Sequence, residues 1–258
     1  MRPPLPFLIS IPHGGEEIPA CVQDRVALTR ADILEDGDAF TREIYDFGTQ
    51  VVEVIQADVA RAIVDVNRDR ADLPPRHHDG VVKMVTCYKR AVYREGCLPD
   101  RALVDRLIEG YYQPYHERIR DAVGRDGIAM GFDCHSMAQE APPIAARPGQ
   151  RRPLICLGNV HGQSCDMRWV EVLAACFRDV FALKEEDVAI NEPFSGGFVT
   201  HTYGASPIPW IQIEINRSFY LRRPWYDASS LQMSTVRLQE LHALLVRVLQ
   251  EFGSTMAQ

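Results

Sequence analysis

The sequence predicts a single α/β domain whose mixed, mostly parallel sheet lies between layers of helices. Short apolar runs alternate with helical patterns from one end of the 258-residue chain to the other, and this alternation is typical of strand–helix–strand units. No internal repeat, low-complexity segment or change of composition divides the chain. A length of 258 residues suits one large domain or two small ones. We therefore expect one domain over residues 1–258.

The predicted strands are short apolar or β-branched runs that end at turn-forming residues. The first, at residues 7–11, is followed by Pro12 and the Gly14-Gly15 pair, which end a strand. The other predicted strands are residues 51–55, 60–66, 81–87, 128–134, 154–157, 188–190 and 210–215.

The predicted helices have apolar residues at helical spacing, and the clearest covers residues 99–123. Pro114 lies inside that helix and is expected to kink it. A capping box is predicted at Thr29-Arg-Ala-Asp32. A loop is expected near residues 73–79, and a mobile surface loop over residues 138–153. The other helices are expected at residues 38–49, 167–181 and 229–252.

The composition is that of an ordinary globular protein, with 46% hydrophobic and 24% charged residues. With 28 Lys plus Arg against 35 Asp plus Glu, the net charge is −7. This balance argues against a nucleic-acid partner, because duplex-binding proteins usually carry a basic surface. No apolar run approaches the roughly 18 residues of a membrane-spanning helix, and residues 7–11 are too short for a signal peptide. Seven cysteines without a Cys-x-x-Cys pair suit reduced thiols, so we expect a cytoplasmic protein.

Polar, titratable residues recur where the predicted strands end. Because ligands of open α/β sheets bind beyond the carboxyl ends of the strands, these residues are candidates for a site. They are His13, Glu16, Asn67, Arg68, His135, Glu214 and Arg217.

His13 and Glu16 offer an imidazole and a carboxylate three residues apart, on a turn with two glycines. Zn²⁺ accepts such ligands, and a catalytic zinc typically has three from the protein. His135 is the expected third ligand. Asp133 is placed to orient a ligand residue without itself binding the metal. A His-x-x-Glu pair alone is weak support for a metal site, and an exposed loop pair without a metal is the alternative.

Glu214 lies between two isoleucines on a predicted strand, and a carboxylate there is costly to bury without a partner or a task. One hypothesis is a salt bridge to Arg217 or Arg68. The other is a general base whose pKa is raised by an apolar environment.

Asn67-Arg68 could hold an anionic substrate, because a guanidinium matches a carboxylate bidentately. The alternative is an ordinary ion pair of Arg68 with Asp69 or Asp65. His201 and Tyr203 follow a Ser-Gly-Gly turn and are candidates to line the pocket.

Three further arginines lie on the 138–153 loop. Either they close over an acidic substrate or they form a solvated run of charge. These residues are Arg147, Arg151 and Arg152.

Short motifs spread from residue 10 to residue 220 resemble, in their order and spacing, the N-formylglutamate amidohydrolases (formylglutamate deformylases). Each motif is modestly specific by itself. The motifs are Ser10-Ile-Pro-His13-Gly-Gly, Glu35-Asp36, Val64-Asp-Val-Asn67-Arg68, Tyr112-Gln-Pro-Tyr-His116, Phe132-Asp-Cys-His135-Ser136-Met, Leu157-Gly-Asn, Ser164-Cys-Asp166, Asn191-Glu-Pro-Phe-Ser-Gly-Gly197, Thr202-Tyr-Gly204 and Gln212-Ile-Glu214-Ile-Asn-Arg217-Ser-Phe-Tyr220.

That family is similar in turn to the zinc carboxypeptidases and related exopeptidases. These enzymes bind zinc with a His-x-x-Glu pair and a later His, and they use a strand Glu as base. The resemblance therefore implies one Zn²⁺ per chain on His13, Glu16 and His135, with Glu214 as the catalytic base. It also implies the zinc-exopeptidase (phosphorylase/hydrolase-like) architecture.

The same resemblance implies that Asn67 and Arg68, together with Arg217, hold the carboxylates of a small acidic N-acyl amino acid. The expected reaction is hydrolysis of N-formyl-L-glutamate to formate and L-glutamate, as in histidine degradation, by a monomer or small homo-oligomer. One alternative is a zinc amidohydrolase or carboxypeptidase-like enzyme acting on another N-acyl amino acid, a peptide or a cell-wall amide. The other is a metal-free ligand-binding protein.

Overall fold

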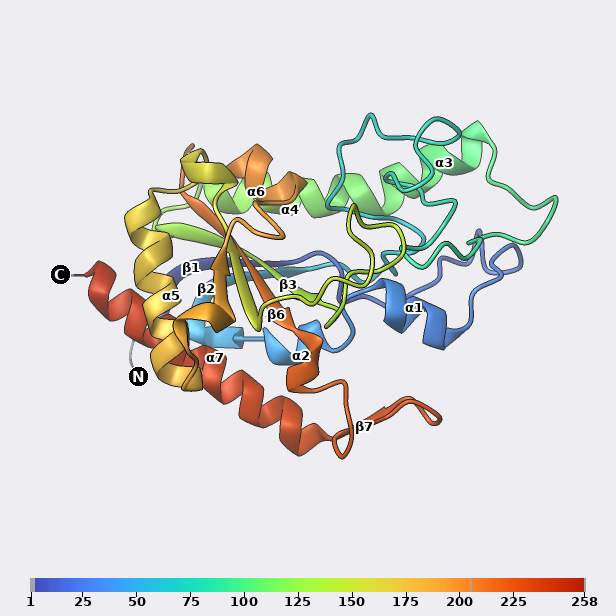
Figure 1. Ribbon diagram of the computed structural model, residues 1–258. Helices are drawn as coiled ribbons and strands as arrows, with labels where there is room; N and C mark the ends of the chain where they lie inside the picture. The colour runs from blue at the N-terminus through green and yellow to red at the C-terminus, as the bar shows by residue number, and fades with distance from the viewer. Residues whose placement is uncertain (1–2, 205, 258) are drawn as a thin grey trace.

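A six-stranded sheet forms the centre of the fold (Figure 1), in a computed structural model that describes residues 3–204 and 206–257. Its strands are β1 (Leu5–Ile11), β2 (Val51–Gln56), β3 (Met130–Met137), β4 (Ile155–Gly158), β5 (Val188–Ile190) and β6 (Trp210–Asn216). The order is β2-β1-β3-β6-β4-β5. Strands β2, β1, β3 and β6 are parallel, β4 is antiparallel to β6, and β5 is parallel to β4. The predicted mixed, mostly parallel sheet is confirmed.

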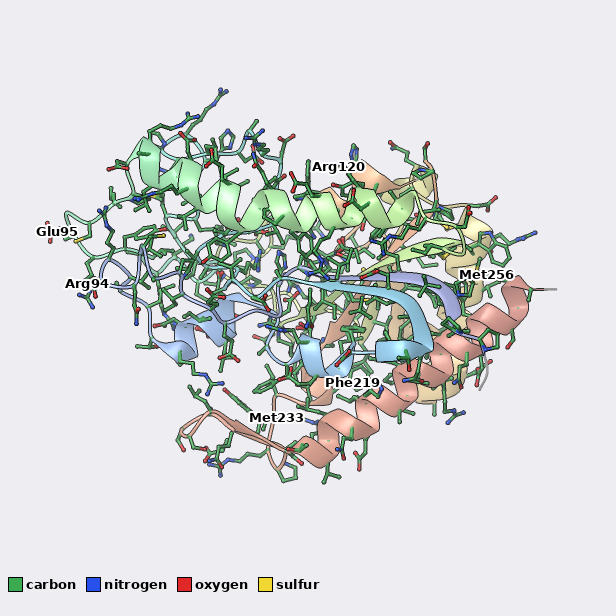
Figure 2. The ribbon with its side chains drawn as sticks, turned by 180° about the vertical axis from the view of Figure 1, so that it is seen from behind. Arg94, Glu95, Arg120, Phe219, Met233 and Met256 are labelled. Atoms are coloured by element: carbon green, nitrogen blue, oxygen red, sulfur yellow. The ribbon has the colours of Figure 1, made fainter. Side chains whose placement is uncertain are left out.

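Helices cover both faces of this sheet, as Figures 1 and 2 show from opposite sides. They are α1 (Arg30–Asp36), α2 (Thr41–Ile44), α3 (Arg101–Leu107), α4 (Gln113–Val123), α5 (Met167–Phe181), α6 (Phe198–Tyr203) and α7 (Thr235–Met256). Short 3₁₀ turns occur at Gly48–Gln50, Val160–Gly162, Glu185–Asp187 and Arg217–Phe219. Helices α2, α5 and α7 pack together on one face, and α3, α4 and α6 lie on the other.

Side chains of the strands alternate between these two layers. Phe7 and Ile9 of β1 pack with residues of α5 and α7, whereas Leu8 packs with residues of α3, α4 and α6. This alternation follows from the two-residue period of a strand. Because both faces of the sheet are buried, β1 is mainly apolar. In the carboxyl-terminal halves of β3 and β6, buried polar residues alternate with apolar ones.

The predicted helix over residues 99–123 is present as α3, a π-helical segment (Ile108–Tyr112) and α4. Asp100 caps its start by accepting a hydrogen bond from the N–H of Leu103 at 2.8 Å. Pro114 is the second residue of α4, which follows the π segment. Because proline lacks the N–H donor and its ring crowds the preceding turn, a wider turn accommodates it.

Two predicted strands, at residues 60–66 and 81–87, are wrong. Both segments are largely buried but irregular, and a single bridge joins Val64 to Val82. The N–H of Val64 donates to the carbonyl of Ala60 at 3.1 Å. The N–H of Asp65 donates to the carbonyl of Val81 at 2.8 Å. Local turns and isolated long-range hydrogen bonds thus satisfy this backbone, and the apolar residues reflect burial rather than a continuous strand.

Two predicted helices are shorter than expected, and α6 was not predicted. The helix over residues 38–49 is reduced to α2, followed by a 3₁₀ turn. The last helix begins at Thr235, because a small hairpin of β7 (Tyr226–Asp227) and β8 (Gln232–Met233) precedes it. The capping box at Thr29 is confirmed at the start of α1. Among the described ranges, none of the helices has the length and apolar character that crossing a bilayer would require.

Candidate functional site

A cavity of about 260 Å³ lies at the ends of β1, β3 and β6. Parallel strands direct their carboxyl ends, and the residues that follow them, to the same edge of a sheet. The polar residues that line the cavity include His13, Asp38, Asn67, Arg68, His135, Arg152, Glu214 and Arg217.

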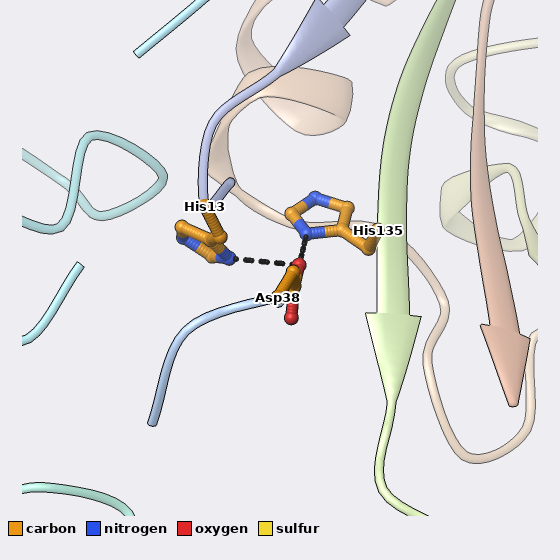
Figure 3. A group of neighbouring side chains, drawn as sticks. All are labelled: His13, Asp38 and His135. Atoms are coloured by element: carbon orange, nitrogen blue, oxygen red, sulfur yellow. Dashed lines mark hydrogen bonds and ion pairs between the residues drawn. The ribbon is translucent and has the colours of Figure 1, made fainter. Parts of the chain in front are cut away.

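Three buried side chains, those of His13, Asp38 and His135, meet in this cavity (Figure 3). One ligand atom from each lies within 4.8 Å of the others. Oδ2 of Asp38 is 2.9 Å from Nδ1 of His135 and 3.5 Å from Nδ1 of His13. His13 follows β1, His135 lies on β3, and Asp38 comes from the connection between α1 and α2. A hydrogen bond of 2.9 Å from the N–H of Asp38 to the carbonyl of His13 brings that connection to the end of β1.

The far nitrogen of each imidazole faces a further buried carboxylate. Nε2 of His13 is 2.8 Å from Oδ1 of Asp65, and Nε2 of His135 is 3.1 Å from Oδ2 of Asp133. Metal-binding histidines commonly have such a carboxylate behind the ring, which fixes the tautomer and directs the other nitrogen to the ion. Both rings therefore present Nδ1 towards Asp38.

The electrostatics of this group favour a positive charge among the three residues. Burial alone would raise the pKa of Asp38, but hydrogen bonds and charge from His13 and His135 outweigh it and hold the pKa well below its usual range. Burial would lower the pKa of His135, but Asp133 and Asp38 outweigh it and raise that pKa well above its usual range. Buried carboxylates around two imidazoles make a site that a cation can occupy.

Glu16, predicted as a metal ligand, is not brought into this group. Its Oε2 instead accepts a hydrogen bond from Nε of Arg30 at 2.7 Å, in a partly exposed ion pair. Gly15 lies so close to the backbone of Asp58 that a Cβ there would be 2.3 Å from the Asp58 carbonyl oxygen. This close approach fixes the course of the loop after His13 and leaves Glu16 outside the cavity. Asp38 is the carboxylate that the fold brings to the two imidazoles.

Glu214 lies on β6, opposite His135 of β3, and lines the cavity. Nε2 of Gln212 donates to Oε1 of Glu214 at 2.8 Å. Burial raises the pKa of Glu214 above its usual range, although the charge of His135 opposes the shift. Within the described part of the chain, Glu214 forms no ion pair with Arg68 or Arg217, so the structure does not contain the salt bridge considered as its alternative role.

Asn67 lines the cavity, but its amide is engaged by the protein. Nδ2 donates to Oδ2 of Asp133 at 3.1 Å and lies 3.0 Å from Nε2 of His135. Oδ1 accepts a hydrogen bond from the N–H of Val199 at 2.7 Å. Asn67 therefore holds Asp133, the carboxylate that faces the His135 ring, whereas the sequence predicted that Asn67 binds substrate.

Arg217, also predicted to bind substrate, has its guanidinium committed to the loop that carries Asp38. Nη2 donates to Oδ1 of Asp38 at 3.0 Å, and Nη1 donates to the carbonyl of Glu35 at 3.0 Å. Nε donates to Oγ of Ser136 at 3.1 Å. Arg217 thus links the loop of Asp38 to the end of β3.

Arg68 remains at the edge of the cavity, with its side chain 35% exposed. Nη2 donates to Oδ2 of Asp79 at 2.8 Å, and Nε lies 3.4 Å from Oδ2 of Asp65. The guanidinium therefore keeps donors that can face a ligand in the cavity.

His201 and Tyr203, predicted to line the pocket, lie on α6 and are not among the residues that line it. His201 is exposed. The hydroxyl of Tyr203 is 2.9 Å from Nδ1 of His116, within the layer formed by α3, α4 and α6.

Sequence reasoning missed the positions of two acidic residues beside the imidazoles, although it had considered Asp65 as an ion-pair partner of Arg68, and Oδ2 of Asp65 lies 3.4 Å from Nε of Arg68. Asp38 follows Glu35-Asp36-Gly37, and this acidic run was a signal for a charged loop. Asp65 lies inside the motif that drew attention to Asn67. Neither residue has a spacing from His13 that marks it as a partner, because long-range folding brings them together.

Comparison with known proteins gives consistent matches. The family model described as N-formylglutamate amidohydrolase matches residues 5–221. A curated N-formylglutamate deformylase from Pseudomonas putida is 29% identical over 254 residues, which cover 93% of this chain and 92% of the relative.

Two solved structures share the fold. One is an N-formylglutamate amidohydrolase from Ralstonia eutropha, 22% identical with a TM-score of 0.74, covering 96% of this chain and 93% of that chain. The other is a gene product of Agrobacterium tumefaciens, 18% identical with a TM-score of 0.64, covering 98% of this chain and 92% of that chain.

Proposed function

Because this chain belongs to the N-formylglutamate amidohydrolase family, we propose that it is a zinc-dependent hydrolase that converts N-formyl-L-glutamate to formate and L-glutamate. The observation that carries the proposal is the convergence of His13, Asp38 and His135 in the same cavity as Glu214. Such a group joins candidate metal ligands to a candidate base, which is an arrangement that can hydrolyse an unactivated amide.

The donor set fits zinc. Nδ1 of His13, Nδ1 of His135 and a carboxylate oxygen of Asp38 would hold the ion, and three protein ligands are typical of a catalytic site with an open position. The carboxylates of Asp65 and Asp133 behind the rings support this assignment. A bound zinc ion would supply Lewis acidity, which polarises the formyl oxygen and makes water a stronger nucleophile.

Glu214 is the general base in this proposal. Its buried carboxylate accepts a proton from the attacking water and later donates that proton to the departing amide nitrogen. Burial favours this role, because it brings the pKa of the carboxyl group closer to working pH. Gln212 holds Oε1, which leaves Oε2 to carry the proton.

Arg68 is proposed to bind the α-carboxylate of the substrate from the edge of the cavity. A guanidinium can grip a carboxylate with two parallel hydrogen bonds. We propose the cytoplasm as the location, since the seven cysteines are free thiols and a reducing compartment keeps them so.

The test is formate release from N-formyl-L-glutamate by the purified protein, with N-acetyl-L-glutamate and a glutamyl dipeptide as competing substrates. We expect N-formyl-L-glutamate to be cleaved fastest, a chelator to stop the reaction, and added zinc to restore it. Preference for another substrate would identify a different amidohydrolase. Full activity after exhaustive removal of metal would refute the zinc assignment.

A further inference from the structure

Four arginines line the cavity, and three of them are paired with carboxylates of the protein. These ion pairs offset the charge of the three arginines and hold them in place. Arg68 has two carboxylates at ion-pair distance, although its buried Nε, like that of Arg152, has no hydrogen-bond partner. The three pairs are Arg61–Asp65 at 3.1 Å, Arg68–Asp79 at 2.8 Å and Arg217–Asp38 at 3.0 Å.

Arg152 is the fourth, and it lacks such a partner. Within the described part of the chain, no carboxylate lies at ion-pair distance from its guanidinium, and its buried Nε has no hydrogen-bond partner. A buried donor without an acceptor costs free energy. The guanidinium of Arg152 is therefore suited to bind a ligand that supplies a hydrogen-bond acceptor.

The position of Arg152 is fixed by its backbone and by a neighbouring ring. Its N–H donates to the carbonyl of Gln139 at 3.0 Å, and its carbonyl accepts from Nδ2 of Asn216 at 3.4 Å. The guanidinium carbon lies 4.8 Å from the centre of the Phe194 ring. Arg152 and Phe194 both line the cavity, so the cation–π contact holds the guanidinium of Arg152 at the cavity wall.

The charge of Arg152 is poorly compensated where it lies. Burial lowers the pKa of Arg152, and the nearby carboxylate of Glu214 offsets only part of that shift. An anionic ligand in the cavity would supply the missing countercharge. A carboxylate fits best, because it accepts two hydrogen bonds from the planar guanidinium.

We propose that Arg152 binds the side-chain carboxylate of the substrate and so selects acidic N-formyl amino acids over neutral ones. The identity of the substrate rests on the proposed function. Arg68 holds the α-carboxylate, which all N-formyl amino acids share, so Arg152 is the residue that distinguishes glutamate from glutamine.

The test compares N-formyl-L-glutamate with N-formyl-L-glutamine, which has the same shape without the side-chain charge, using the zinc-loaded enzyme. For Arg152→Gln, we expect kcat/KM for the glutamate substrate to fall roughly 10- to 100-fold, the range expected for hydrogen bonds to a charged group. For the glutamine substrate, we expect little change, which also shows that the variant is folded. Arg152→Lys keeps the charge and should retain part of the preference. Arg147→Gln, an exposed arginine on the same loop, is the matched control and should behave as the wild type.

A binding measurement separates failure of this inference from failure of the proposed function. Glutarate and its monoamide are titrated calorimetrically into zinc-loaded wild type and Arg152→Gln. Tighter binding of glutarate to the wild type, lost in the variant, supports the role of Arg152 even if no formyl substrate is cleaved. If Arg152→Gln lost the same affinity for glutarate and for its monoamide, or lost affinity for neither, the proposed role of Arg152 would be overturned.

Discussion

Asp65 accepts a hydrogen bond from Nε2 of His13 at 2.8 Å, on the side of the ring opposite to Asp38. Nε of Arg61 donates to the other oxygen of Asp65 at 3.1 Å. Burial alone would raise the pKa of Asp65, but the charges of His13 and Arg61 outweigh it and hold that pKa well below its usual range. Asp65 is therefore an ionised carboxylate that fixes the ring of His13.

The variant Asp65→Asn should weaken zinc affinity by roughly 10- to 100-fold, because an amide holds the imidazole less firmly than a carboxylate does. Competition with a fluorescent chelator measures this affinity. Asp121→Asn, an exposed position on α4, is the control and should bind zinc as the wild type does. Unchanged affinity in Asp65→Asn would show that Asp65 has no part in holding a metal.

The variant Glu214→Gln should reduce kcat by roughly 10²- to 10⁴-fold, the contribution typical of a general base. The glutamine keeps the shape of the side chain but cannot accept the proton. Zinc content should stay at the wild-type value, since Glu214 is outside the group of three ligands. The exposed Glu171→Gln on α5 controls for the change of charge. A fully active Glu214→Gln enzyme would refute the assignment.

Arg217 offers a test between a substrate-binding role and a positioning role. Lysine cannot reproduce its separate hydrogen bonds to Asp38, Glu35 and Ser136. We expect Arg217→Lys to weaken zinc affinity by about tenfold or more, with KM at saturating zinc nearly unchanged. The opposite pattern, a raised KM with normal zinc affinity, would restore the sequence-based prediction that Arg217 binds substrate.

His116 should make stability fall at mildly acidic pH. Burial lowers its pKa from 6.5 to about 4, although the hydrogen bond to the carbonyl of Val66 opposes the shift. Between these two pH values the unfolded chain therefore binds a proton at His116 that the folded chain excludes. The contribution of the neutral His116 ring to the free energy of unfolding is fully present above pH 6.5 and is lost as the pH falls towards 4. The loss is on the order of 3 kcal/mol.

Urea unfolding at several pH values, followed by circular dichroism, measures this effect. His116→Gln should be less stable than the wild type at neutral pH, and the difference should shrink between pH 6.5 and 4. His78→Gln, at an exposed position, should follow the wild-type pH dependence throughout. Parallel curves for His116→Gln and wild type would contradict the prediction.

The elements that sequence predicted well are those whose pattern is local. The predicted helix and strand at Met167–Phe181 and Val188–Ile190 have the same bounds in the structure, because amphipathic spacing and a short apolar run are sufficient there. Residues 60–66 are as apolar as a strand, but their burial comes from packing over the sheet rather than from joining it. A pattern of apolar residues does not distinguish the two.

The sequence predicted those site residues whose positions follow from locally recognisable strands. His13, His135 and Glu214 follow or end strands that the sequence shows, so their meeting could be expected. Asp38 reaches them through one long-range hydrogen bond to the carbonyl of His13. The choice between Asp38 and Glu16 depends on the course of two loops, which local sequence does not specify.

The metal content of two matched variants, measured by mass spectrometry after dialysis against zinc, decides whether Asp38 or Glu16 is the third metal ligand. We expect Asp38→Asn to lose most of its zinc, whereas Glu16→Gln keeps about one ion per chain, as a three-ligand catalytic site requires. Loss of zinc from Glu16→Gln with full retention by Asp38→Asn would contradict this expectation.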